Sequence, residues 1–260
     1  MKQSGTTTLL QGAVQDLASG VVSALRGGDH TRESGTWFSV SANDGTGDLA
    51  LAAVRVLGAD AVLPHVLLRM PPGADQLALF SKAMAAYPPA TGAAPTLLWS
   101  HWGMTRALRA LRRLDAPPAD RPTGAEDHEH HEHHERDERH EREHPESEPD
   151  AGWLEDVSWQ VLTHQLAVLA PLAVPGEDSA VARAARRRPV DVARGFVRAV
   201  RRRDWLQAAG AGRWLTLLEG VPDTLGLESG LDFVALMGGD DPRVALQVRA
   251  AQLMRTGEPV

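Results

Sequence analysis

Seven histidines lie within seventeen consecutive positions near the middle of the chain, and these residues carry its most obvious chemistry. Neutral imidazole is the commonest protein ligand for metals such as zinc and nickel, and neighbouring carboxylates could complete a coordination shell. The seven are His128, His130, His131, His133, His134, His140 and His144. Because residues 126–149 include no apolar side chain that could fix a ligand geometry, we expect weak zinc or nickel binding and no required cofactor.

Residues 140–144 also match the pattern H-E-x-x-H, in which two helical histidines bind zinc and the glutamate acts as a base. A metallopeptidase needs a structured, partly dry site and a third ligand for the metal. Here the neighbouring side chains are charged, and Pro145 follows directly. We therefore interpret the match as a chance product of a tract rich in His and Glu.

Four arginines form a second candidate site. Arg194, Arg198, Arg201 and Arg202 stand at helical spacing, so they would share the polar face of an amphipathic helix. A nucleic acid, an acidic lipid or an acidic protein could bind there, and so could the chain's own acidic tract. The alternative is that the four arginines form an ordinary solvated helix face without a binding role. The sequence has 25 arginines and 2 lysines, so arginine is the usual basic residue at any exposed position of this chain.

Aromatic and imidazole side chains form a third candidate. Trp99, His101 and Trp102 cluster in sequence, and His164 lies on a later apolar helix. A histidine between tryptophans could act as a general base in an enzyme pocket. The alternative is a buried, hydrogen-bonded core histidine, which is the commoner role for such a residue.

Apolar residues recur at helical spacing along most of the chain, so helices must position these candidates. Spacing, capping residues and breakers predict helices over residues 9–25, 49–57, 61–70, 75–86, 96–114, 154–169, 179–188, 191–206, 214–218, 230–237 and 242–254. The best candidate for a strand is the short segment Trp37–Ser41. The sequence therefore predicts an all-α fold, or nearly so.

The net charge of −7 is concentrated in one segment. Residues 126–150 hold twelve acids and three arginines, a net charge of −9, and the rest of the chain has a net charge of +2. A generally basic or acidic binding surface therefore does not follow. The absence of cysteine excludes disulfides, thiolate zinc sites and cysteine nucleophiles.

No secretory signal is visible at the N-terminus, and prolines or polar residues interrupt the two long uncharged runs, 83–105 and 157–176. A membrane-spanning helix needs about 20 predominantly apolar residues. We therefore expect no membrane span and a cytoplasmic location, which also suits a chain without disulfides.

The proline-rich exit at residues 115–122 and the charged tract after it divide the chain. We predict an N-terminal helical block (1–118), a disordered or exposed His/Glu/Arg-rich linker (119–150) and a C-terminal helical block (151–260).

Three functions stay open. The favoured hypothesis is a non-catalytic adaptor or accessory protein that acts through protein contacts and carries a weak metal-binding tract. The alternative is a helical enzyme with a pocket near Trp99, His101, Trp102 and His164. The third is a nucleic-acid-binding regulator that uses the Arg194–Arg203 helix, which would need a helix-turn-helix whose turn the sequence does not place.

Deleting residues 126–149 should abolish zinc and nickel uptake and leave the thermal unfolding transition nearly unchanged, since the tract has no apolar residue to contribute to a core. Isothermal titration at several pH values checks this, because binding should weaken as the pH falls through about 6.5, where free imidazole becomes protonated. A large loss of stability on deletion or chelation would mean that the tract is an integral metal core.

Peptidase activity that disappears with Glu141→Gln would contradict the chance interpretation of the H-E-x-x-H match.

Overall fold

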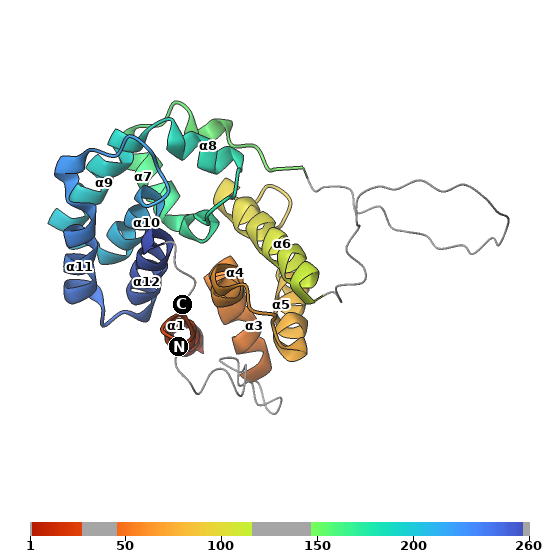
Figure 1. Cartoon of the computed structure of the whole chain (residues 1–260). Coiled ribbons are helices and arrows are strands. Elements are labelled where there is room, and N and C mark those ends of the chain that lie inside the picture. The colour runs from red at the N-terminus through yellow and green to blue at the C-terminus, as the bar shows by residue number, and fades with distance from the viewer. Residues whose placement is uncertain (1, 28–45, 116–146, 257–260) are drawn as a thin grey trace, which may run out of the picture.

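Helices are the only regular elements in the ranges that the computed structural model describes, residues 2–27, 46–115 and 147–256 (Figure 1). The all-α prediction is therefore confirmed for those ranges. The candidate strand Trp37–Ser41 and the seven histidines of the metal-binding prediction lie outside them.

The first part of the chain is α1 (Lys2–Leu25), α3 (Thr46–Leu57), η1 (Gly58–Val62), α4 (Leu63–Leu68), α5 (Ala74–Ala86) and α6 (Pro95–Asp115). Gly58 ends α3 because its positive φ of 66° breaks the helical path at little cost. Pro64 lies in the first turn of α4, where the missing N–H has no helical partner to lose.

The second part is η3 (Gly152–Leu154), α7 (Trp159–Val168), η4 (Ala170–Leu172), α8 (Ala180–Arg186), α9 (Pro189–Arg201), α10 (Trp205–Leu215), η5 (Asp223–Leu225), α11 (Leu227–Gly238) and α12 (Pro242–Thr256). Side-chain oxygens of Ser158, Ser179 and Asp204 accept backbone N–H hydrogen bonds at the starts of α7, α8 and α10. These caps replace bonds that a helix cannot supply to its own first turn.

The predicted helix over residues 191–206 is wrong in its extent, because two helices share that segment. α9 ends at Arg201, Arg203 has a left-handed φ of 59°, and α10 starts at Trp205. The predicted short helix at 214–218 was wrong in its start, because Trp214 lies inside α10. α10 escaped detection because its middle is Ala208–Gly212, which has no large apolar residue to show a helical period.

Two hydrophobic clusters form the core, and neither stops at the predicted block boundary. The N-terminal cluster joins α1 and α3–α6 to Leu246, Ala250 and Leu253 of α12. The C-terminal cluster joins α7–α12 to Trp99 and Trp102 of α6. In Figure 1, α1 lies beside α12 although the two helices stand at opposite ends of the sequence. Helices α6 and α12 therefore bridge the two clusters.

The last residues of the predicted linker also pack on the fold. The Asp150 carbonyl accepts hydrogen bonds from the indole N–H groups of Trp99 and Trp153, both at 3.0 Å. The Glu148 carboxylate accepts from the Ala180 N–H and from Arg183. The block division itself stays a prediction, but Glu148 and Asp150 of the predicted linker contact the helices, so a deletion of residues 126–149 would also remove the Glu148 contacts.

A buried polar network connects the two parts of the chain. Arg213 on α10 is fully buried and donates from Nη1 to an Asp60 oxygen on η1 at 2.7 Å. The same Nη1 donates to Gln247 Oε1 on α12, and Gln247 donates back to the other Asp60 oxygen. Arg213 Nε donates to the Ala173 carbonyl. Four segments are thus fixed around one guanidinium.

One helical run, Gly47–Leu68, is long and apolar enough to cross a membrane by length and composition, and 67% of its window is buried inside the protein. Such burial is common for core helices of soluble proteins. Ala61, Val62 and Leu63 of this run all belong to the N-terminal cluster.

Replacing Asp60 with Ala should lower the free energy of unfolding by about 3–5 kcal/mol, because the charge of Arg213 would stay buried without its partner. The double variant Asp60→Ala/Arg213→Met should lower the free energy of unfolding by less than the sum of the two single variants, since no unpaired charge remains. Urea denaturation measures the free energy of unfolding of the two single variants and of the double variant.

The matched control is Asp178→Ala, which breaks the largely exposed pairs with Arg183 and Arg186 and should leave the free energy of unfolding nearly unchanged. An Asp60→Ala effect as small as that of the control would show that the buried network does not hold the fold together.

Candidate functional site

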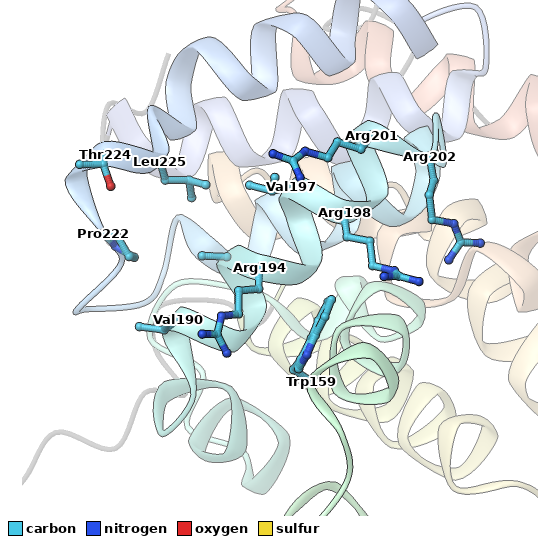
Figure 2. Close-up of a pocket in the computed structure, with 11 residues that line it drawn as sticks. Trp159, Val190, Arg194, Val197, Arg198, Arg201, Arg202, Pro222, Thr224 and Leu225 are labelled. Carbon is cyan, nitrogen blue, oxygen red and sulfur yellow. The ribbon is translucent and has the colours of Figure 1, made fainter.

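The four predicted arginines lie together on the exposed face of α9 and line an open groove of about 840 Å³. The helix exposes them because its opposite face is buried: Val192, Phe196 and Ala199 belong to the C-terminal cluster. Arg194, Arg198, Arg201 and Arg202 therefore point to solvent as the spacing predicted (Figure 2).

Trp159 at the start of α7 forms one side of the groove. Gly195 makes this possible, because a Cβ at that position would lie 2.0 Å from Thr163 Oγ1, so only glycine lets α9 approach α7 so closely. The guanidinium carbon of Arg198 stands 5.7 Å from the centre of the Trp159 ring (Figure 2). A cation–π contact of this kind holds the arginine over the indole face.

The other side of the groove comes from the turn around η5. Pro222, Thr224 and Leu225 face α9 across the groove, and Val190, Ala193 and Val197 of α9 add apolar surface (Figure 2). The site thus combines an apolar floor with a row of cations. Sequence reasoning missed Trp159 and the η5 residues, because they come from other segments, 30 residues before the start of α9 and 22 residues after its end.

Acidic residues neutralise only one end of the arginine row. Asp191 lies in the first turn of α9 and pairs with Arg188 at 2.8 Å and with Arg194 at 3.7 Å. Among the residues that the structure describes, no ion pair engages Arg198, Arg201 or Arg202. Guanidinium stays protonated at any physiological pH, so this end of the groove carries a permanent positive charge.

The preceding arginines have a different role. Arg186 pairs with Asp178, Arg187 pairs with Glu155, and Arg188 donates to the Val157 carbonyl at 2.8 Å. The contacts of Arg187 and Arg188 tie the α8–α9 turn to the segment before α7, and the Arg186 pair joins the end of α8 to the residue before its N-cap.

The residues of the enzyme hypothesis differ in their exposure to solvent. Trp99 is fully buried and stacks edge-to-face on Trp102, with ring centres 5.0 Å apart. Trp102 also carries the Arg106 guanidinium on its ring. His101 is half-buried on α6, whereas His164 is exposed on α7 and contacts Gln207 Oε1 at 3.3 Å. Trp99 is thus sealed in the core, and His164 lies at the surface.

His65 shows the core role that was the alternative for the histidines. It is buried, with Nε2 2.9 Å from Gln76 Oε1 and Nδ1 3.1 Å from the Met70 carbonyl. Burial lowers the pKa of His65, although both hydrogen bonds act in the opposite direction. Desolvation thus favours the neutral imidazole, which helps to join α4 to α5.

The metal prediction concerns residues outside the described ranges. Inside those ranges, no group of three or more His, Asp or Glu side chains is placed to hold a metal ion. Comparisons with protein-family models, curated proteins and solved structures find no match for this chain. The groove is therefore interpreted from its own geometry.

Proposed function

We propose that this protein is a non-catalytic helical adaptor that binds an acidic, amphipathic segment of another protein in the α9 groove. The observation that carries the proposal is the row of arginines along an apolar floor, with an indole at its side. Arginine binds carboxylates with two parallel hydrogen bonds, and the floor can bury aliphatic side chains. A helix with acidic and apolar faces offers both, which is the helix-in-groove mode of recognition.

Nucleic acid is the weaker candidate for this groove. In helix-turn-helix proteins the N-terminal residues of the second helix reach the bases, but the first turn of α9 carries Asp191, which would repel phosphates. A stacking site for bases is also restricted, because Arg198 covers the Trp159 ring. Outside the 126–150 tract the chain is nearly neutral, so no long-range field would attract a polyanion.

An enzyme has less support than an adaptor. The alternative hypothesis depended on one pocket shared by the Trp99–Trp102 segment and His164. Trp99 is buried in the core whereas His164 is exposed, which favours separate roles over one shared pocket. The groove itself offers guanidinium and apolar groups, which bind and orient anions but exchange no proton at neutral pH.

The test uses a labelled synthetic helix with glutamates on one face and leucines on the other. Fluorescence anisotropy should show binding by the full chain that weakens as salt is added. Replacing Arg194, Arg198 and Arg201 with Gln should weaken binding about tenfold, because three exposed charge pairs at about 0.5 kcal/mol each add up to that factor.

A matched control variant replaces Arg26, Arg112 and Arg113 with Gln, which removes the same charge from exposed positions outside the groove. It should bind like the wild type. An equal loss of peptide affinity in the groove variant and the control variant would show that only the net charge of the protein matters, and it would contradict the proposal. Tighter binding of a single-stranded DNA probe, lost in the groove variant only, would replace the adaptor with the nucleic-acid hypothesis.

A further inference from the structure

A second pocket, of about 250 Å³ and more enclosed than the α9 groove, lies where α6 meets η1, α4 and η4. Its lining comes from both hydrophobic clusters: Leu63 belongs to the N-terminal cluster, whereas Trp102 and Leu172 belong to the C-terminal cluster. It shares no lining residue with the α9 groove. A volume of this size lies at the small end of the range for ligand pockets, so it suits a small molecule and not a peptide helix.

One face of α6 supplies the positive charge of this pocket. Arg106, Arg109 and Arg113 recur at intervals of three and four residues, so they lie on the same side of the helix, and all three line the pocket. Among the described residues of the lining, Glu177 after η4 is the only acid. Three guanidinium groups and one carboxylate leave the lining with an excess of two positive charges.

Arg106 is fixed in place and already pairs with that carboxylate. Its Nη2 donates to the two Glu177 oxygens at 3.0 and 3.1 Å, and its guanidinium carbon stands 5.3 Å from the centre of the Trp102 ring. Across the ranges that the structure describes, no ion pair engages Arg113, which is exposed near the end of α6. Guanidinium stays protonated, so an anion that enters the pocket meets a permanent positive charge at its rim.

The rest of the lining is largely apolar. Leu63 and Val66 of α4 and Leu172 and Val174 around η4 provide much of the wall. Gly103 leaves room for Leu172, because a Cβ at that position would lie 2.3 Å from Leu172 Cδ2. No described lining residue is Ser, Thr, Asn, Gln, His or Tyr, so the hydroxyls of a sugar would lose their hydrogen bonds to water without replacement. The lining therefore suits one anionic group on an apolar body.

We propose that this pocket binds a small amphipathic carboxylate, with its anionic group on Arg109 and Arg113 and its hydrocarbon part against the apolar wall. Guanidinium and carboxylate match in charge and in planar geometry, so an arginine can donate two parallel hydrogen bonds to the ligand. The apolar wall gains from covering the hydrocarbon, which also leaves water. Because the α9 groove takes no part, the proposal does not depend on the adaptor function.

An NMR titration of the full chain with hexanoate tests the site, with hexanol and hexylammonium as the neutral and cationic probes. The indole N–H signal of Trp102 should shift with hexanoate and saturate with a dissociation constant on the order of 1 mM, as expected for so small a ligand. Hexanol should bind about tenfold more weakly, since it keeps the apolar contacts but loses the charge-assisted hydrogen bonds. Hexylammonium should leave the signal unchanged, because the arginines repel it.

Two variants separate the charged and apolar parts of the site. Arg109→Gln/Arg113→Gln should weaken hexanoate binding about tenfold and leave hexanol binding unchanged, because only the anionic group loses its partners. Ala110→Trp places a large ring in the pocket from an exposed position and should abolish the binding of both probes. Circular dichroism confirms that the variants fold.

The matched control Lys82→Gln/Arg112→Gln removes the same charge from exposed positions outside the pocket and should bind hexanoate like the wild type. An equal loss of hexanoate affinity in this control and in the arginine variant would overturn the proposal. Equal affinity for hexanoate and hexanol, or a Trp102 signal that never shifts, would overturn it as well. A shift of the Trp159 signal alone would place the anion in the α9 groove, which contradicts the pocket and leaves the adaptor proposal intact.

Discussion

The buried ion pair between Arg213 and Asp60 constrains the rest of this fold. A guanidinium at zero exposure needs a partner of opposite charge, because desolvation costs several kcal/mol per ion. Asp60 supplies that charge, and Asp60, Gln247 and the Ala173 carbonyl accept the hydrogen bonds of Nη1 and Nε from three separate segments, whereas Nη2 makes no hydrogen bond to a described residue. η1, η4 and α12 therefore have to dock around α10 together, and this couples the N-terminal and C-terminal clusters.

The position of α10 at the centre of the second cluster explains how the groove is formed. Its small residues let neighbouring helices approach: a Cβ on Gly210 would lie 2.8 Å from the Ala167 carbonyl oxygen of α7, and one on Gly212 would lie 2.6 Å from Leu231 of α11. α7, α9 and α11 pack around this narrow helix. The groove between Trp159, the α9 arginines and the η5 turn lies at the outer edge of that packing (Figure 2).

Sequence periodicity predicts the helices well where large apolar residues mark one face. α5 and α6 begin within a residue of the predicted positions, and Asp241 before Pro242 marks the start of α12 as expected. Periodicity fails for α10, because the middle of this helix, Ala208–Gly212, is buried but consists only of alanine and glycine. A signal was nevertheless present, because Arg213 is the only charged residue in 205–218 and an isolated charge among small apolar residues suggests a buried pair.

The sequence predicts the arginine side of the groove but not its opposite wall. Spacing on one helix places Arg194, Arg198 and Arg201 on one face, since that depends on local geometry alone. The opposite wall depends on how distant segments pack, and Trp159 and Leu225 carry no local mark of that role. The burial of Trp99 and the exposure of His164 are likewise properties of packing.

The central claim is that the chain on both sides of residues 116–146 forms one cooperative unit around the Arg213 network. Differential scanning calorimetry of the full chain tests it most directly. The account predicts one transition, with a ratio of calorimetric to van't Hoff enthalpy of about 1. Two resolved transitions, or a ratio near 2, would show that the two parts unfold independently and would contradict it.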